Sequence, residues 1–156
     1  MKRPPLLAVI LGTGFGSGFW PWGPGTAGAL LATLMWLGMA HVLTAKALFA
    51  VTLALIVLFT ALGTWAANRL EPFWGEDPKR VVIDEMIGVW IPLLGCPPDN
   101  AWYAWGAFAL FRFFDILKPL GIRRIDRRRG GFWVQADDIV AGIYSLIIIL
   151  IVRWAA

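Results

Sequence analysis

The chain has 156 residues, the length of a single domain, and it is unusually apolar: 59% of its residues are hydrophobic and only 15% are charged. A domain of this size has too little interior to hide so much apolar surface from water, which excludes a soluble globular protein. The same composition excludes a disordered chain and, despite a net charge of +4, a nucleic-acid-binding protein. The single cysteine, Cys96, excludes an internal disulfide framework. The composition therefore predicts a membrane protein.

Several apolar segments reach or approach the roughly 20 helical residues that cross a bilayer. They are residues 27–43, 47–67, 81–96, 101–117 and 139–154. We expect an all-α fold, in which residues 1–156 form one transmembrane bundle with about four or five spanning helices. The glycine- and proline-rich residues 12–26 precede this bundle as a re-entrant or interfacial segment, and Thr26 is expected to cap the first spanning helix.

Charged residues are confined to a few places in the chain. Residues 1–70 contain no Asp or Glu, and five arginines gather in residues 123–129. The positive-inside rule places this arginine loop in the cytoplasm. With five crossings, the polar loops then share the cytoplasmic side, and these are residues 12–26, 68–80 and 118–138. The turns at residues 44–46 and 97–100, together with the C-terminus, are expected on the opposite side.

On this topology five acids from three helices meet at one membrane face: Asp84, Glu85, Asp115, Asp137 and Asp138. Each also has a structural interpretation that the sequence leaves open. The first pair marks a solvated helix start, where acids suit the helix dipole, and the last pair offers a helix N-cap. Asp115 lies three residues from both Arg112 and Lys118, a spacing that allows a self-neutralising ladder before Pro119 ends the helix.

Five uncompensated carboxylates at low dielectric repel one another strongly, and a hard divalent cation is the simplest way to hold them together. Carboxylate oxygens without Cys or His favour Mg²⁺ or Mn²⁺ over Zn²⁺. The only histidine, His41, is expected near the opposite face in a structural role. Such a metal, beside cationic side chains, suits phosphate chemistry.

A glycine series also suits an anion. Gly12, Gly14, Gly16 and Gly18 alternate around Thr13 and Ser17, and small residues let backbone N–H groups approach a phosphate. Tight helix packing through small residues explains the same pattern, and the sequence does not decide between the two. The arginines at 123–129 follow from the positive-inside rule and would also attract anionic lipid.

Motifs spread over nearly the whole chain resemble those of phosphatidylglycerophosphatase A. They are GTGFGSG at 12–18, PGT at 24–26, DE at 84–85, FRxxDxxKP at 111–119, IRxxDR at 122–127 and DDIVAG at 137–142. The resemblance implies an all-α, Mg²⁺-dependent lipid phosphatase of the bacterial inner membrane. Its reaction would be the hydrolysis of phosphatidylglycerophosphate to phosphatidylglycerol and inorganic phosphate.

With this resemblance the candidate residues take specific roles. We predict that Asp84, Glu85, Asp137 and Asp138 hold Mg²⁺ and that Asp84, Asp115 and Asp138 are catalytic, with Asp115 either a further ligand or the general base. Thr13, Ser17, Thr26, Arg112, Lys118 and Arg123 are predicted to bind the substrate. The expected partners are the phospholipid substrate and membrane lipids, with no nucleic acid, and the sequence leaves a homo-oligomer open.

Two other functions compete with this prediction. A metal-dependent phospholipid-headgroup transferase also gathers aspartates at a membrane face, but the chain lacks the DxxDGxxAR pattern of those enzymes. A small transporter or channel needs polar groups through the depth of the membrane. Residues 47–67 and 139–152 offer only Thr, Tyr, Ser and Gly as interruptions, so transport is the weaker hypothesis.

Overall fold

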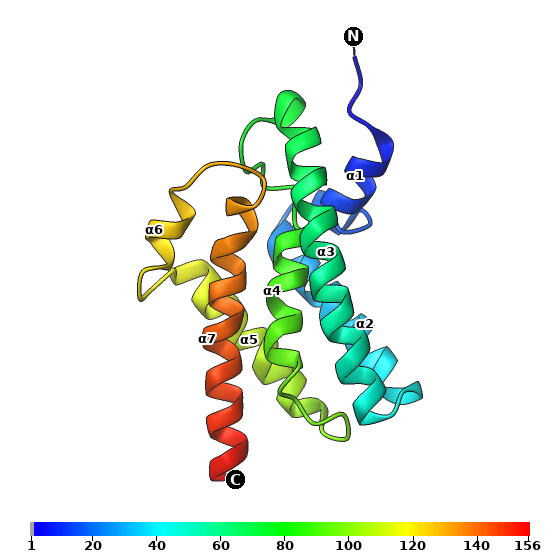
Figure 1. Ribbon diagram of the computed structural model, residues 1–156, viewed down its shortest axis with the longest axis vertical. Helices are drawn as coiled ribbons and strands as arrows, with labels where there is room; N and C mark the ends of the chain where they lie inside the picture. Colours follow the sequence, from blue (N-terminus) through cyan, green and yellow to red (C-terminus); the bar gives the residue numbers. More distant parts are fainter. Residues whose placement is uncertain (1) are drawn as a thin grey trace.

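The computed structural model describes residues 2–156, which form α-helices and one short 3₁₀ helix, with no β-strand among them (Figure 1). The predicted all-α class is confirmed. In chain order the elements are α1 (Leu6–Gly12), η1 (Ser17–Phe19), α2 (Pro24–Val42), α3 (Ala45–Trp74), α4 (Ile83–Leu93), α5 (Ala101–Leu117), α6 (Ile122–Asp126) and α7 (Trp133–Ala155).

Helix α4 is the centre of the bundle and packs against α2, α3, α5 and α7 (Figure 1). Every residue of α4 except Glu85 is buried, as expected for a helix that is apolar on all sides after its acidic first turn. The indole N–H of Trp90 donates a hydrogen bond of 3.1 Å to the carbonyl oxygen of Ala32 in α2. The same indole meets the ring of Phe59 in α3 edge-on, with centroids 5.1 Å apart. These contacts hold α4 between its neighbours.

Three helices of the described chain are long and apolar enough to cross a membrane: α2, α3 and α7. Helix α4 has 11 residues and is only about 16 Å long, about half of a typical hydrocarbon core of ~30 Å. It needs no greater length, because its neighbours and not lipid cover its surface. About four or five spanning helices were expected. The structure has three helices of spanning length, and the other two expected segments form the shorter helices α4 and α5.

The boundaries of several helices differ from the expected ones. Helix α3 continues to Trp74, into the predicted loop 68–80, because Leu70 is fully buried where Gly12 of α1 lies against it. Helix α7 begins at Trp133, six residues before the predicted segment. Helix α2 begins at Pro24 with Gly23 as its N-cap, so the prediction that Thr26 caps this helix is wrong. Proline suits the first helical position because its missing N–H would be unpaired there in any case.

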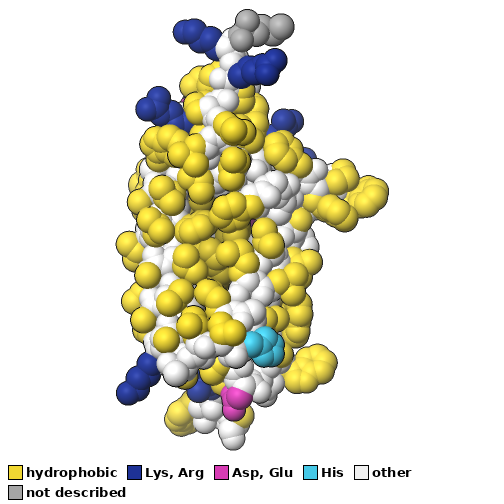
Figure 2. Space-filling view, turned by 90° about the vertical axis from the view of Figure 1, so that its right-hand side faces the viewer, with side chains coloured by type: hydrophobic (Ala, Val, Ile, Leu, Met, Phe, Trp, Pro, Cys, Tyr) yellow, Lys and Arg dark blue, Asp and Glu magenta, His cyan; other side chains and the backbone are white. Residues whose placement is uncertain are grey.

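The polar residues collect toward one end of the bundle. The starts of α2, α4 and α7 and the end of α5 lie toward this end, flanked by α1 and α6 (Figure 1). The α2–α3 and α4–α5 connections lie at the other end. On the face that Figure 2 shows, hydrophobic side chains cover the middle and Lys and Arg side chains lie near the two ends. This distribution matches a molecule with its middle in hydrocarbon and its ends in the headgroup layers.

Candidate active site

Two acids open helix α4 and two lie in the second turn of α7. Asp84 and Asp138 are 5% and 2% exposed, so both carboxylates are enclosed by the bundle. The idea that Asp84 marks a solvated helix start is therefore wrong, because α4 starts inside the protein. The idea that Asp137 or Asp138 caps α7 is also wrong, because the N-cap is Phe132 and no side chain caps this helix.

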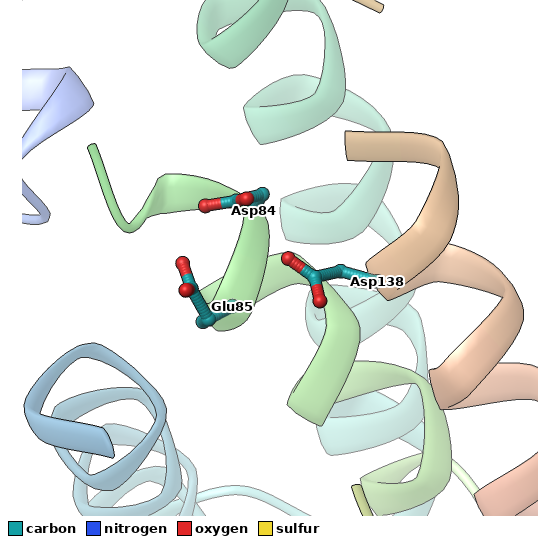
Figure 3. A group of neighbouring side chains, drawn as sticks. All are labelled: Asp84, Glu85 and Asp138. Carbon is teal, nitrogen blue, oxygen red and sulfur yellow. The ribbon is translucent and has the colours of Figure 1, made fainter. Parts of the chain in front are cut away.

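Asp84, Glu85 and Asp138 come together between α4 and α7, with one carboxylate oxygen from each within 4.8 Å of the others (Figure 3). At this separation two like charges repel by on the order of 3 kcal/mol at an effective dielectric constant near 20. Three buried oxygens of this group, Asp84 Oδ1, Glu85 Oε2 and Asp138 Oδ1, accept no hydrogen bond from any atom of residues 2–156. Buried polar atoms in native proteins normally have a partner, so these oxygens are available as ligands for a cation.

Two glycines explain why α4 and α7 come so close at this point. A Cβ atom on Gly88 would stand 2.3 Å from the ring of Phe111 in α5 and 2.9 Å from the carbonyl oxygen of Asp138, and one on Gly142 would stand 2.4 Å from the carbonyl oxygen of Gly88. Gly88 follows Asp84 by four residues, and Gly142 follows Asp138 by four. One helical turn therefore separates each aspartate from the backbone contact. The contact sets the distance between the two carboxylates.

A second group contains Asp115, Asp137 and Asp138, again with one oxygen from each within 4.8 Å of the others. Here cations are already present. Lys118 Nζ lies 2.5 Å from Asp137 Oδ2 and 3.9 Å from Asp115 Oδ1. The hydrogen bond to Asp137 and the surrounding negative charges outweigh burial and raise the pKa of Lys118 above its ordinary value, so the amine stays protonated.

Arg112 belongs to the same region. Its Nη1 donates a hydrogen bond to Asp115 Oδ2 one turn along α5, and its Nε has no partner among the described residues. Gly25, in the first turn of α2, lies beside it: a Cβ atom there would stand 2.6 Å from Glu85 Oε1 and 3.3 Å from Arg112 Nη1. The glycine thus lets α2 begin directly against the site. The predicted ladder from Arg112 through Asp115 to Lys118 is present, and it faces the other carboxylates.

The glycine series packs against the segment that leads into α4. The N–H of Val82 donates to the carbonyl oxygen of Gly12 at 2.8 Å, and a Cβ atom on Gly18 would stand 2.0 Å from the carbonyl oxygen of Arg80. Thr13 is 1% exposed; its hydroxyl donates to Val9 O and accepts from Gly16 N. These contacts support the packing explanation of the glycines. A phosphate-binding role for this loop stays a prediction.

The other predicted substrate-binding residues differ in position. The hydroxyl of Ser17 donates to the carbonyl oxygens of Thr13 and Gly14 inside its own loop. Thr26 is exposed in the first turn of α2, next to Gly25 and hence next to the site. Arg123 is exposed on α6 and forms no ion pair with any residue of the described chain.

Two acids near the site were not predicted. Asp126, at the end of α6, lies 3.3 Å from Lys118 Nζ through its Oδ1 and so shares that amine with Asp137. Asp77 lies in the α3–α4 loop, where partial enclosure and the charges of Asp84 and Asp126 raise its pKa to about 6. Asp77 lies in a loop and Asp126 ends a helix of five residues, so neither shows a periodic pattern in the sequence. The motif IRxxDR at 122–127 was the one signal that included Asp126.

The residues present fit a divalent cation. Six carboxylates face only two cationic side chains here, namely Asp84, Glu85, Asp115, Asp126, Asp137 and Asp138 against Arg112 and Lys118. The two cations serve the group of Asp115 and Asp137, whereas the unpaired oxygens belong to the group of Asp84, Glu85 and Asp138. An all-oxygen donor set suits Mg²⁺ or Mn²⁺.

Comparison with known proteins identifies the family. Residues 10–153 match the family model described as Phosphatidylglycerophosphatase A. The chain belongs to the phosphatidylglycerophosphatase A family. The predicted resemblance is confirmed, and the chain is a phosphoric monoester hydrolase. This membership decides against the transporter and the headgroup transferase.

Individual relatives span most or all of the chain. Proteins named "Phosphatidylglycerophosphatase A" from Haemophilus influenzae and Escherichia coli are 37% and 35% identical, covering 99% and 87% of this chain and 94% and 77% of theirs. A protein of Bacteroides thetaiotaomicron named "Putative phosphatidylinositol-3-phosphatase" is 58% identical over 99% of this chain and 98% of its own. No solved structure matches the chain.

Proposed function

We propose that the protein hydrolyses phosphatidylglycerophosphate to phosphatidylglycerol and inorganic phosphate, with Mg²⁺ as cofactor, at the cytoplasmic face of the membrane. The observation that carries the proposal is the buried group of Asp84, Glu85 and Asp138, whose unpaired oxygens lie beside Arg112 at one end of an apolar bundle. A lipid phosphatase needs both an apolar bundle and a polar site at its end, because the substrate lies in the membrane and the P–O bond that is cleaved lies at the membrane surface.

Asp84, Glu85 and Asp138 would hold the metal ion, and Asp137 stays a predicted fourth ligand whose Oδ2 is at present bonded to Lys118. Bound Mg²⁺ would supply a Lewis acid for the phosphoryl oxygens and lower the pKa of a water molecule. Because these acids come from two helices held by Gly88 and Gly142, their spacing is set before substrate arrives. Preorganised charge of this kind is usually a large part of catalysis.

The cationic side chains would bind the terminal phosphate. Arg112 lies next to Glu85, and its Nε has no partner among residues 2–156. Asp115 orients the guanidinium through Nη1. In the reaction a P–O bond forms to a water oxygen while the P–O bond to the lipid headgroup breaks. A carboxylate of the site accepts a proton from the water and passes a proton to the headgroup oxygen, which leaves as the alcohol. The prediction from sequence makes Asp115 either this base or a further metal ligand.

The proposed orientation depends on the arginines of residues 123–129. These residues span α6 and the start of the α6–α7 loop, at the same end as the carboxylates, and cytoplasmic segments carry the excess of Lys and Arg. A membrane-impermeant thiol reagent tests the orientation: in Cys96→Ser protein, a cysteine placed at Arg128 should react only after inverted vesicles expose the cytoplasmic side. Reaction in intact cells would contradict it.

Phosphatidylinositol 3-phosphate is a second candidate substrate, because the Bacteroides relative that is 58% identical carries that activity in its name. Both lipids present a phosphomonoester on an anionic phospholipid headgroup, so the same carboxylates and Arg112 serve either. The two differ in what lies between that phosphate and the diester: a glycerol or an inositol ring.

One assay tests the proposal and separates the two lipids. Purified protein in detergent should release phosphate from phosphatidylglycerophosphate with Mg²⁺ and stop when EDTA is added. Phosphatidylinositol 3-phosphate at equal surface concentration should be hydrolysed at least about tenfold more slowly, a difference of ~1.4 kcal/mol in transition-state binding. The opposite ratio would assign the inositol lipid, and no phosphate from either lipid would refute the proposed function.

A further inference from the structure

An apolar groove runs along α2 from the candidate active site toward the middle of the bundle. It has a volume of about 370 Å³ and contains no charged residue among its lining, which is Trp20, Trp22, Gly23, Thr26, Ala27, Leu30, Leu31 and Leu34. Thr26, Leu30 and Leu34 follow one another at intervals of four residues, so they line one face of the helix. The groove is therefore a track along α2 and not a hole between helices.

The polar end of this groove adjoins the site. Thr26 lines the groove, and its chain neighbour Gly25 lies against Glu85 and Arg112, with a Cβ position 2.6 Å from Glu85 Oε1. A lipid phosphate bound at Arg112 would thus have its remaining atoms within reach of the start of the groove. The groove and the site therefore meet at neighbouring residues of α2, Thr26 and Gly25.

The length of the groove matches one leaflet. From Thr26 to Leu34 the helix rises about 12 Å, and half of a hydrocarbon core is ~15 Å. Trp20 and Trp22 stand at the mouth with their rings edge-to-face, 5.7 Å between centroids, and Trp22 is 85% exposed. Tryptophan concentrates where the headgroups meet the hydrocarbon. The mouth therefore lies at the interface and the far end near the bilayer centre.

Charge at the mouth favours a phospholipid over an apolar helix of another protein. Trp20 also lines a second cavity, which contains Lys79 and Arg80. An anionic headgroup suits these cations, while its hydrocarbon suits the leucines on the other side of Trp20. By contrast, no lysine or arginine of the described chain lines the apolar groove between α5 and α7, which extends along α5 from Trp102 to Phe113.

We propose that this groove seats one acyl chain of the phospholipid substrate and so guides the terminal phosphate to Arg112. The proposal rests on the proposed function. Since hydrocarbon surrounds an acyl chain inside or outside the groove, seating it changes little hydrophobic free energy. The groove instead aligns the lipid, and alignment determines how often the phosphate reaches the reactive position.

The kinetic test blocks the groove at two depths. Leu34→Trp fills the far end and should lower kcat/KM for a dioleoyl substrate by about tenfold, because misplacement of a substrate by about 1 Å costs that much or more. The same variant should leave a dihexanoyl substrate within about twofold, since the short chain does not reach position 34. Leu30→Trp, one turn nearer the mouth, should impair both substrates.

The matched control is Leu58→Trp, on an exposed position of α3 outside the groove. It should change neither substrate, and thermal unfolding of all three variants should match the wild type. The proposal would be overturned if Leu34→Trp and Leu58→Trp lowered kcat/KM equally. It would also be overturned if Leu34→Trp lowered kcat/KM equally for the two substrates. If the wild type released no phosphate from either chain length, the proposed function itself would fail.

A direct test needs no turnover. A benzophenone amino acid is placed at position 34 or at position 58, and the protein is mixed in vesicles with a clickable dioleoyl phosphatidylglycerophosphate. Position 34 should cross-link to this lipid at least about fivefold more than position 58, because a bound lipid stays at position 34 while position 58 meets only bulk lipid. Excess unlabelled lipid phosphomonoester should compete for position 34 alone. Cross-linking to a second copy of the chain, or equal labelling at the two positions, would refute the acyl chain as occupant.

Discussion

The backbones of Gly88 and Gly142 touch where α4 crosses α7, because a Cβ atom on Gly142 would stand 2.4 Å from the carbonyl oxygen of Gly88. One turn away, Asp84 and Asp138 face each other with unpaired oxygens. The close crossing of α4 and α7 therefore determines both how the centre of the bundle packs and where the carboxylates of the proposed metal site lie.

We predict that Gly88→Ala and Gly142→Ala each lower phosphate release by at least about tenfold. A methyl group at Gly142 pushes α7 from α4, and one at Gly88 meets both the ring of Phe111 and the backbone of α7, so each shifts Asp84 relative to Asp138. Overpacking should also cost about 1–3 kcal/mol of stability, measured by unfolding in detergent. Gly106→Ala in α5 is the control, since among the described residues no atom beyond its chain neighbours and the backbone of its own helix lies within 4 Å of its Cβ position. Full activity in both crossing variants would contradict the geometric role of these glycines.

Asp84→Asn and Asp138→Asn should each raise the stability of the metal-free protein and lower the activity measured with Mg²⁺. Without divalent cations each substitution removes a buried repulsion, so both variants should unfold at a higher temperature than the wild type. With Mg²⁺ present their phosphate release should fall at least about 100-fold. Asp99→Asn, at the other end of the bundle, should change neither quantity. A fully active Asp84→Asn protein would sink the metal assignment.

Removing Mg²⁺ should lower the stability of the wild type by an amount that depends on the Mg²⁺ concentration relative to the dissociation constant. At a Mg²⁺ concentration 100 times the dissociation constant, binding to the folded state alone contributes about 2.7 kcal/mol. We expect a Mg²⁺ titration of the EDTA-treated protein to raise its Tm, and the Asp84→Asn/Asp138→Asn double variant to show no such rise. A rise of equal size in both proteins would mean that Mg²⁺ binds elsewhere.

Lys118→Met should destabilise the protein by up to about 3 kcal/mol, a figure reduced because the amine is partly solvated. The change leaves Asp137 and Asp126 without the amine that lies 2.5 Å and 3.3 Å from them. Adding Asp137→Asn to Lys118→Met should recover part of the loss. Lys46→Met, exposed at the start of α3, is the control. If the second substitution recovered nothing, the Lys118–Asp137 pair would not be the cause.

Asp77 should report the charge of the site through the pH dependence of stability. Its pKa in the folded protein, about 6, lies above the ordinary 3.8. Ionisation of Asp77 therefore disfavours the folded state, and the cost develops as the pH rises from about 4 through about 6. In EDTA, Asp77→Asn should raise the Tm at pH 7.5 and not at pH 4. An equal shift at both pH values would show that charge is not responsible.

Much of the fold could be predicted because its signals are local. Residues 101–117 were expected to be helical and form α5 with the same bounds, since Asn100 caps the start and Pro119 follows the end. The starts of α2 and α7 and the end of α3 could not be predicted in the same way. Leu70 extends α3 because it packs on α1, a contact between segments that lie far apart in the sequence.

The membrane class and the short set of chemically useful residues were determined by the sequence alone, because hydropathy, charge placement and the motifs are properties of the chain itself. The tertiary structure decided which of those carboxylates are paired with a cationic side chain and which are not. It leaves Asp84, Glu85 and Asp138 unpaired, and it gives Asp115 and Asp137 to Arg112 and Lys118. Spacing along the chain places acids at one end of a bundle, but only the contact of α4 with α7 decides which carboxylates meet and which already have a cation.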